Sequence, residues 1–424
     1  MELNEALSFI HGTDWKGSRL GLERMRELMR RLGDVQDTLK YVHVAGTNGK
    51  GSTSTMLASI LRSAGYKTGL YTSPHLVRVN ERFRIDGADV SDAALCRAAE
   101  AVKAAADGME DAPTEFEILT AMAFWYFAEQ RCDAVVLEVG LGGRLDATNV
   151  IRSPEAAVIA NIGLEHTAIL GDTLPKIAAE KAGILKPGTT AVTYPVSAAV
   201  DAVYRAVCAE RGARWHPVSF DTLREREHSL AGQRFDYGGE TDLSLHLLGV
   251  HQCRNAALAV ETVRVLREKG WRISEKALRE GLEAARWEAR FEVLRRDPPF
   301  IVDGAHNPQC IDALCASLDE YLPGEKALFL LGVLADKDYE AMLARLLPYG
   351  KKFFCLTPDS PRALCAPALC AKLRAMGAAA EEFSSVGEGV RRAAEESGGE
   401  TPVVACGSLY LMGEVRRTIQ DCPY

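Results

Sequence analysis

The sequence predicts an α/β protein, in which a P-loop-type, mostly parallel sheet with a small antiparallel patch is followed by a smaller Rossmann-like α/β domain. Three observations predict this. Strand-like and helix-like segments alternate almost throughout, as in sheets covered by helices on both faces. One strand is followed directly by a Gly-rich loop and the start of a helix. The chain has 424 residues, which is long for one hydrophobic core. We expect domains at residues 1–288 and 289–424.

The elements of the first domain follow from apolar runs bounded by Gly, Pro and polar residues. Strands are predicted at 41–45, 133–139, 156–161 and 189–194, and helices at 53–61, 116–130, 174–185, 253–269 and 274–285. Lys186-Pro187-Gly188 stops the third of these helices. Between about residues 220 and 248 the pattern changes, and 234–239 is typical of a hairpin, which predicts the antiparallel patch.

A linker is predicted at 287–299, because the segment is charged and ends in Asp297-Pro298-Pro299, where a helix cannot continue. A new β/α series begins after it. Its strands are predicted at 300–303, 327–333, 352–356 and 403–405, with helices between them and a last helix at 410–419. The alanines at 378–380 are expected in a helix or a loop.

Composition excludes several classes of function. Lys and Arg number 50 and Asp and Glu 58, so the net charge of −8 argues against nucleic acid as the main partner. No apolar run approaches the ~20 residues that span a bilayer, and the first residues do not resemble a signal peptide. The 11 cysteines are scattered without C-x-x-C, which favours free thiols over a zinc site. We expect a cytoplasmic monomer that binds small molecules, and neither membrane nor nucleic acid.

The Gly-rich loop is the strongest functional signal. It consists of Gly46, Thr47, Asn48, Gly49, Lys50, Gly51 and Ser52. Glycines let backbone N–H groups turn toward an anion, the helix N-terminus adds positive potential, and Lys50 adds a full charge. The loop departs from the strict P-loop pattern, since Val44 replaces the first Gly and Gly51 separates Lys50 from the hydroxyl of Ser52. A tight turn that binds nothing is the alternative, and the lysine and hydroxyls favour nucleotide binding.

Two further candidates follow predicted strand ends. Glu138 ends an apolar strand before a segment with three glycines, where a carboxylate can hold Mg²⁺ on a nucleotide. The alternative is a strand-end carboxylate that faces solvent. His166 follows the next strand, at the same edge of the sheet, and is either a metal ligand or a structural histidine.

Lys181 and the segment after the linker carry less specific signals. Lys181 stands in an otherwise apolar helix, and the residues alone favour a solvated lysine paired with a neighbour. Asp303 and His306 follow the first strand of the second domain and can face a ligand across an interdomain cleft. Asn307 and Pro308 after them fit a helix N-cap and first turn, which is the structural alternative.

Ten short motifs occur in one order along nearly the whole chain. They are G-T-N-G-K-G-S at Gly46, T-S-P-H-L at Thr72, F-E-I-L-T at Phe116, L-E-V-G-L-G-G-R-L-D-A-T-N at Leu137, N-I-G-L-E-H-T at Asn161, E-K-A-G-I at Glu180, H-Q-C-R-N-A at His251, R-F-E at Arg290, D-G-A-H-N-P at Asp303 and G-S-L-Y-L at Gly407. Together they resemble the folylpolyglutamate synthases, including the bifunctional dihydrofolate synthases. These belong to the wider group of ATP-dependent amide ligases that contains the Mur ligases.

The resemblance implies roles that the residues alone do not. Lys50 and the loop amides would hold the ATP phosphates, and Ser73, Glu138 and His166 would ligate Mg²⁺. Lys181 would carry a carbamate, which reverses the interpretation above. The remaining implied roles are contacts to the nucleotide from Gln252, Asn255, Arg290, Asp303 and His306, a substrate contact from Ser408, and catalytic parts for Lys50, Lys181 and His306. The chain departs from the family at Trp287-Glu288-Ala289-Arg290, where the family usually has Trp-Pro-Gly-Arg.

The implied activity is ATP-dependent ligation of L-glutamate to a folate-type carboxylate, which is tetrahydrofolate, dihydropteroate or both, through an acyl phosphate. Residues 78–89 are a candidate substrate loop. Two alternatives are a Mur-type ligase acting on another carboxylate and a P-loop ATPase without ligase activity. The phosphate loop begins at Gly46, which leaves no room for the N-terminal UDP-sugar domain of a Mur-type ligase, and the D-G-A-H-N-P segment argues against a simple ATPase.

Overall fold

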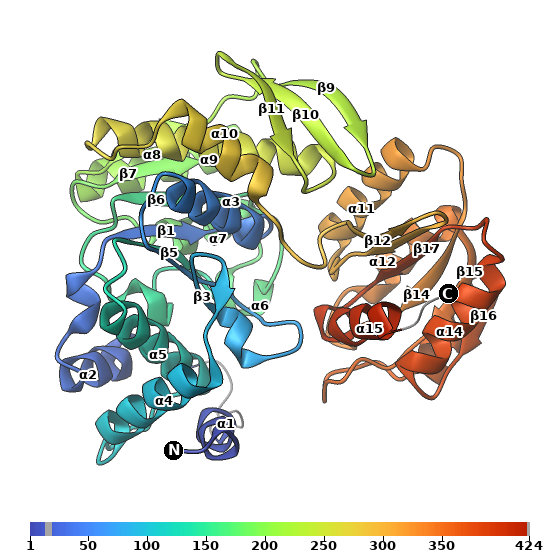
Figure 1. Ribbon diagram of the computed structural model, residues 1–424, viewed down its shortest axis with the longest axis horizontal. Coiled ribbons are helices and arrows are strands. Elements are labelled where there is room, and N and C mark those ends of the chain that lie inside the picture. The colour runs from blue at the N-terminus through green and yellow to red at the C-terminus, as the bar shows by residue number, and fades with distance from the viewer. Residues whose placement is uncertain (13–18, 422–424) are drawn as a thin grey trace. The chain divides into compact units, whose positions relative to one another are not determined.

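The computed structural model describes residues 1–12 and 19–421. By their internal contacts these residues form two compact units, of which Met1–Leu223 with Arg254–Ala285 is unit 1, and Arg224–Cys253 with Arg286–Tyr424 is unit 2. Figure 1 shows both units as sheets flanked by helices, which confirms the α/β fold class. The predicted domain boundary after residue 288 stays a prediction.

Unit 1 is built on a sheet of eight strands within the described residues, in the order β4-β3-β2-β5-β1-β6-β7-β8. The strands are β1 Tyr41–Ala45, β2 Thr68–Tyr71, β3 Phe83–Ile85, β4 Ala88–Asp89, β5 Ala134–Glu138, β6 Ala156–Ile159, β7 Thr190–Thr193 and β8 Arg214–Pro217. From β2 to β8 all neighbours are parallel, and only β3 and β4 at one edge are antiparallel. The carboxyl ends of β2, β5, β1 and β6 therefore lie next to one another.

Helices cover both faces of this sheet. They are α1 Leu3–His11, α2 Glu23–Arg31, α3 Lys50–Ser63, α4 Asp92–Ala106, α5 Glu115–Glu129, α6 Thr167–Leu170, α7 Leu174–Ala182, α8 Ala198–Arg211, α9 Val250–Glu268 and α10 Glu275–Ala284, with short 3-10 helices η2 Val35–Thr38, η3 Val79–Arg82 and η4 Ala147–Val150. In Figure 1, α3 and α10 lie above the strands and α4 and α5 below them. Alternate residues of β1 point to one apolar face of the sheet: Tyr41 packs in a cluster with α4 and α5, and Ala45 in a second cluster with α7 and α8.

Unit 2 contains two sheets. The smaller is antiparallel, in the order β11-β10-β9, and comprises β9 Arg224–Ser229, β10 Gly232–Tyr237 and β11 Glu240–Leu245. The predicted hairpin is confirmed as β10 and β11. Strand β9 was missed because all six of its residues are exposed, so the sequence shows no apolar alternation there.

The larger sheet of unit 2 has the order β12-β13-β17-β14-β15-β16. Its strands are β12 Glu292–Arg296, β13 Pro299–Val302, β14 Ala327–Leu331, β15 Gly350–Cys355, β16 Ala380–Glu382 and β17 Val403–Cys406. The helices are α11 Pro308–Tyr321, α12 Tyr339–Leu346, α13 Ala366–Ala375, α14 Val386–Ser397 and α15 Leu409–Asp421, with the 3-10 helix η5 Leu347–Tyr349. Only β12 runs antiparallel to its neighbour.

Three local predictions are wrong. The segment 287–299 is not a plain linker, because residues 292–296 form β12 and pair with β13. Residues 78–89 are not a loop, since they form η3 and then the strands β3 and β4. Ala380 begins the strand β16 and is therefore in neither a helix nor a loop. In each case pairing with a neighbouring strand decides the conformation, and such pairing is invisible in a short stretch of sequence.

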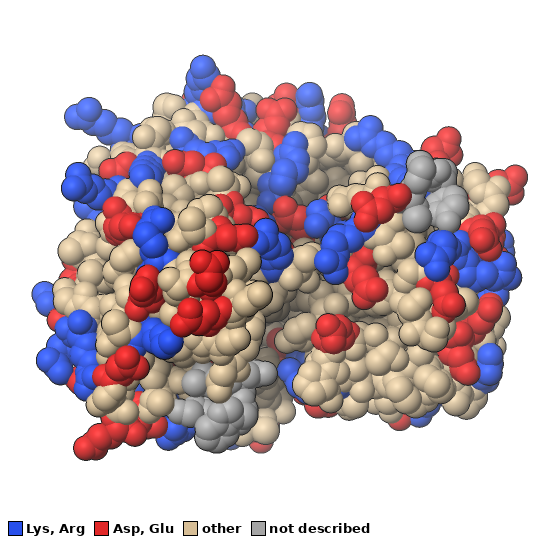
Figure 2. All heavy atoms as spheres, turned by 60° about the horizontal axis from the view of Figure 1, so that its bottom comes forward, with Lys and Arg blue, Asp and Glu red and all other residues tan. Residues whose placement is uncertain are grey.

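Among the described residues, no helix combines the length and the apolar character needed to cross a membrane. On the face that Figure 2 shows, basic and acidic side chains are intermixed.

Candidate active site

The site begins where four neighbouring parallel strands of unit 1 end. β1 runs into the Gly-rich loop, β5 ends at Glu138, β2 is followed by Ser73, and β6 leads toward His166. Because the order is β2-β5-β1-β6, these segments leave the sheet side by side. In open parallel sheets the crevice outside the carboxyl ends of the strands is where ligands bind. The structure thus gathers residues that are more than 100 positions apart in the chain.

The Gly-rich loop is held from its side by the segment after β6. The backbone N–H groups of Thr47 and Asn48 both donate to the carbonyl of Asn161, at 2.7 and 3.3 Å. The Thr47 hydroxyl donates to the carbonyl of Gly163 at 3.2 Å. These bonds fix the loop before any ligand arrives.

The loop then turns into α3. Gly49 is the N-cap, at φ +83°, a left-handed conformation that a residue with a side chain rarely adopts. No side chain caps the helix, and its first helical bond runs from Thr53 N–H to Gly49 O at 2.9 Å. The N–H groups of Lys50, Gly51 and Ser52 precede that bond at the positive end of the helix, which suits them to bind an anion.

Glu138 and Ser73 lie together. Glu138 is 4% exposed, and its Oε2 accepts from the backbone N–H of Ser73 at 3.1 Å. The interpretation of Glu138 as a strand-end carboxylate in solvent is therefore wrong. In the described parts of the chain, no three His, Cys, Asp or Glu side chains gather as metal ligands. The carboxylate of Glu138 and the hydroxyl of Ser73 nevertheless fit Mg²⁺, because this ion takes one or two carboxylates and completes its shell with phosphates and water.

His166 stands at the N-cap of α6, with φ +51°, and its side chain is exposed. Its Nε2 is 4.0 Å from Oε1 of Glu165. The strand order brings the β6 loop beside the phosphate loop, and the resemblance adds a metal contact for His166, which stays a prediction.

Lys181 is buried and not solvated, so the interpretation that the residues alone favoured is wrong. Only 4% of Lys181 is exposed, and Nζ donates to the carbonyl of Gly46 at 2.8 Å. Burial, and next the positive charge of Lys50, lower the pKa of Lys181 to about 7, against opposing effects of Glu165 and Asp146. A large share of this amine is therefore neutral at neutral pH. Two lysines thus meet at the phosphate loop.

Helix α9 carries two residues of the predicted set. Asn255 belongs to unit 1 and is buried beside the phosphate loop, since a Cβ added to Gly49 would lie 2.5 Å from its Oδ1. Gln252 precedes it by three residues in the same helix and is also buried. Residues three apart share one face of a helix.

A second cluster lies in unit 2, after β13 and β17. Asp303 is buried and accepts from the backbone N–H groups of Phe291 and Ala305, both at 2.7 Å. Burial raises the pKa of this carboxyl, and the nearby Arg290 guanidinium opposes that rise. Nδ1 of His306 lies 2.8 Å from the carbonyl of Gly304 and donates to it.

Ser408 joins this cluster through the backbone. The N–H of Gly407 donates to the carbonyl of Ala305 at 2.9 Å, and Ser408 is buried. Asn307 does cap α11, since its Oδ1 accepts from Cys310 N–H at 2.8 Å and Pro308 follows it. The structural role that was predicted for Asn307 is therefore confirmed.

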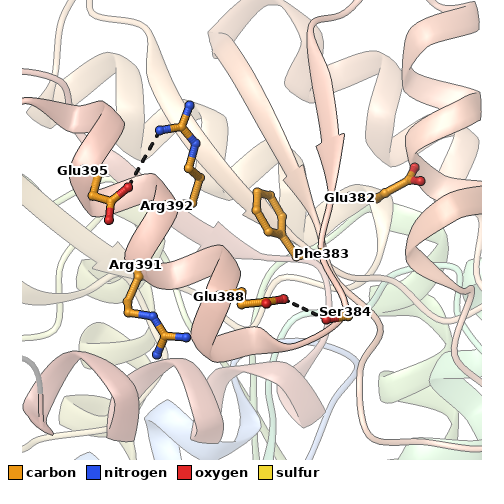
Figure 3. A pocket seen from close by; sticks show the side chains of 7 residues that line it. All are labelled: Glu382, Phe383, Ser384, Glu388, Arg391, Arg392 and Glu395. Carbon is orange, nitrogen blue, oxygen red and sulfur yellow. Dashed lines mark hydrogen bonds and ion pairs between the residues drawn. The ribbon is translucent and has the colours of Figure 1, made fainter.

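Unit 2 also has a surface hollow. Figure 3 shows it beside β16 and α14, with Glu388 bonded to Ser384 (2.7 Å) and Arg392 paired with Glu395 (3.8 Å). None of the predicted site residues lines it.

Sequence reasoning missed two acidic residues of the unit 1 site. Asp146 is buried, and its carboxylate accepts from Leu141 N–H at 2.8 Å and Thr148 N–H at 3.0 Å. Glu165 is close enough to raise the pKa of Lys181. Both stand in the motifs described above, but neither motif shows which of its polar residues is buried.

Comparison with known proteins identifies the family of the chain. Residues 44–263 match the family model of the Mur ligase middle domain, and 289–409 that of the Mur ligase glutamate ligase domain. The chain is 36% identical to the folylpolyglutamate synthase of Lacticaseibacillus casei, with 99% of each chain covered. It is 36% identical to the dihydrofolate synthase/folylpolyglutamate synthase of Bacillus subtilis, with 98% of this chain and 99% of the relative covered. The solved structure of Escherichia coli FolC in complex with DHPP and ADP superimposes with a TM-score of 0.87 at 33% identity, covering 99% of this chain and 98% of that one.

Proposed function

The chain belongs to the Mur ligase family and, within it, to the folylpolyglutamate synthases and dihydrofolate synthases, and from this membership we propose that it joins L-glutamate to a folate-type carboxylate with ATP. One observation carries the proposal. The phosphate loop, Glu138 with Ser73, and the buried Lys181 converge at the carboxyl ends of adjacent strands. The ADP complex of the Escherichia coli relative supports ATP as the nucleotide.

Unit 1 has the groups that a nucleotide triphosphate needs. The uncapped amides of α3 and the ammonium of Lys50 offer donors and positive charge to phosphate oxygens. The Lys50 ammonium now donates to the carbonyl of Thr47 at 3.1 Å, so it lies folded over the loop that it would serve. Asn255 stands beside Gly49, where we propose that it contacts the nucleotide. For Gln252, which precedes it in α9 and belongs to unit 2, we propose a further nucleotide contact.

We propose that Ser73, Glu138 and His166 hold Mg²⁺. When bound, this ion would neutralise the phosphate charge that develops during transfer. The protein's own part is to fix the Glu138 carboxylate, which the backbone N–H of Ser73 does at 3.1 Å.

For Lys181 we propose a carbamate. A neutral amine attacks CO₂, its nitrogen forms a bond to carbon, and the proton that it loses goes to water, so a cation becomes an anion. The lowered pKa of about 7 supplies the neutral amine. The anion would then counter the charge of Lys50 and of the metal, in a place where a buried second ammonium is unfavourable.

For unit 2 we propose nucleotide contacts from Arg290, Asp303 and His306, with a catalytic part for His306, and a substrate contact from Ser408. The support is the family resemblance together with the clustering of these residues around the ends of β13 and β17. We also propose a cytoplasmic monomer. The ten cysteines among the described residues are free thiols, which fits a reducing compartment, and light scattering tests the monomer.

The proposed reaction has two steps. The carboxylate oxygen of the folate attacks the γ-phosphorus and ADP leaves, which gives an acyl phosphate. The amine of glutamate then attacks the acyl carbon, phosphate leaves, and the amine proton goes to a base or to water. Activation is required because a carboxylate does not condense with an amine in water at a useful rate. The loop amides and Lys50 stabilise the charge of the transferred group.

The test is ADP release by the purified protein with ATP, Mg²⁺ and L-glutamate, with dihydropteroate in one series and tetrahydrofolate in the other. We expect release that requires both glutamate and at least one pteridine substrate, and mass spectrometry should show the glutamylated product. ADP release that is independent of glutamate in both series would refute the proposal and would indicate a simple ATPase.

A further inference from the structure

A histidine occupies the centre of the strand that leads into the phosphate loop. His43 lies in β1, is fully buried, and faces the same side of the sheet as Tyr41 and Ala45, which pack in apolar clusters. Burial lowers the pKa of His43 to about 3, with Lys186 lowering it further, so the ring is neutral. A neutral polar ring inside an apolar layer costs free energy unless hydrogen bonds compensate it.

The ring has one polar partner, and the direction of that bond can be worked out. The Thr148 hydroxyl lies 2.5 Å from Oδ1 of Asp146 and gives its proton to that carboxylate. Its oxygen is then an acceptor for Nε2–H of His43, at 2.9 Å. Nδ1 carries no proton, and it has no hydrogen-bond partner in the described part of the chain. The chain of bonds therefore runs from His43 through Thr148 to Asp146.

Asp146 in turn shapes the loop of residues 140–149. Its Oδ2 accepts from Leu141 N–H at 2.8 Å, and its Oδ1 accepts from Thr148 N–H at 3.0 Å. One carboxylate thus ties both ends of the loop together. This loop starts two residues after Glu138, so its shape affects how the end of β5 is held.

The same loop is fastened to the end of α7, where Lys181 lies. Arg144 N–H donates to Glu180 O at 2.8 Å, and Nδ2 of Asn149 donates to Gly183 O at 3.1 Å. A Cβ on Gly143 would lie 2.9 Å from the carbonyl oxygens of Glu180 and Lys181, so the two backbones are in direct contact. The loop therefore links the strand of Glu138 to the helix of Lys181.

We propose that His43 is a positioning residue for the ligase reaction, acting through Thr148 and Asp146 to hold the 140–149 loop and, with it, Glu138 and Lys181 in their working positions. This inference rests on the proposed function for its catalytic part. Its structural part, that His43 orders the loop, stands independently of the reaction.

The test compares His43→Leu with Tyr41→Phe. Tyr41 is a matched control, because it lies on the same strand and face and its hydroxyl donates a buried bond to Gln36 O at 2.8 Å, away from the loop. Amide hydrogen exchange of the 140–149 peptide is measured by mass spectrometry, alongside kcat and the KM for ATP. For His43→Leu we expect at least ~10-fold faster exchange and a ~10-fold lower kcat, with the KM for ATP within about twofold of the wild-type value. Replacing a residue that supports a metal ligand usually causes losses of this size.

Two further variants keep the test informative if His43→Leu does not fold. Thr148→Val should reproduce the faster exchange and lower kcat, and adding His43→Leu to it should cause little further loss, because both break one chain of bonds. His43→Gln should restore most of both quantities, since its amide N–H can replace Nε2–H.

The inference is overturned if exchange in the loop changes no more than in Tyr41→Phe, or if the effects of His43→Leu and Thr148→Val simply add. If the wild-type protein shows no ligase activity while loop exchange responds as expected, the proposed function fails and the ordering role of His43 remains.

Discussion

Replacing Lys181 with Met is expected to remove a pH dependence from the stability of the protein. In the folded state the pKa of Lys181 is about 7, against 10.5 for a free lysine. Between these two values the unfolded chain binds more protons than the folded one, so the wild-type free energy of unfolding rises with pH. Met binds no proton, and it occupies a similar volume. The difference between the two proteins therefore isolates the contribution of Lys181.

The size of the effect follows from the shift. With a pKa of 10.5 unfolded and about 7 folded, the ionisation of Lys181 costs roughly 4 kcal/mol of stability at pH 7 and roughly 2 kcal/mol at pH 9. The unfolding free energy of the wild type minus that of Lys181→Met should thus increase by about 2 kcal/mol between pH 7 and pH 9. Because only 4% of Lys181 is exposed, solvent screening reduces this little.

The assay is urea unfolding followed by tryptophan fluorescence at pH 7, 8 and 9. The buffers are free of CO₂ and Mg²⁺, because a carbamate would consume the amine. Lys176→Met is the control, since Lys176 lies on the same helix, is exposed, and its ammonium pairs with Asp172 at 2.9 Å. The unfolding free energy of Lys176→Met should show the same pH dependence as that of the wild type. Unfolding free energies of wild type and Lys181→Met that run parallel within ~0.5 kcal/mol over this range would refute the burial argument.

Three other outcomes are expected. Lys50→Ala should lower ATP turnover at least ~100-fold with an unchanged circular dichroism spectrum, because the phosphates lose their one full charge from the loop. Turnover near that of the wild type would contradict phosphate binding by the Gly-rich loop. Glu138→Ala should raise the Mg²⁺ concentration for half-maximal turnover about tenfold or more, as measured by Mg²⁺ titration, and an unchanged titration would remove Glu138 from the metal site. Gly281→Ala should destabilise unit 1 by ~1–3 kcal/mol in thermal unfolding, because the new Cβ would lie 2.4 Å from Cα of Ile60. Gly387→Ala on α14 is the control and should be nearly neutral, because its Cβ would lie 3.4 Å from the flexible guanidinium of Arg391.

Local sequence was sufficient to predict those elements whose signal lies within the element or directly beside it. The strand at 41–45 lies where the apolar run predicted it, and the Gly-rich loop and a helix follow it, although α3 begins at Lys50, three residues before the predicted start. The hairpin of β10 and β11 was visible because 238–239 is a Gly pair between alternating residues. The cap of α11 was visible because Asn307 and Pro308 are adjacent.

Elements defined by a distant partner were not visible. β12 looked like a charged linker, because its three charged residues and the prolines after it hide a strand that exists only by pairing with β13. β9 is exposed along its whole length and depends on β10 in the same way. Strand propensity is largely a matter of such pairing, so short edge strands escape a local pattern.

By itself, the sequence determined the α/β class, the position of the Gly-rich loop and, through its ordered motifs, the family, because these depend on residues close together or on whole-chain similarity. Only the tertiary structure decided which polar residues act together. Lys181 was a surface lysine by its helix pattern, yet packing buries it against Gly46 and lowers its pKa. His43 is about a hundred positions from Thr148 and Asp146 in the chain, and it meets them only because β1 and β5 are neighbours in the sheet. Burial and the pKa depend on neighbours brought together in three dimensions, and a linear pattern contains no record of those distances.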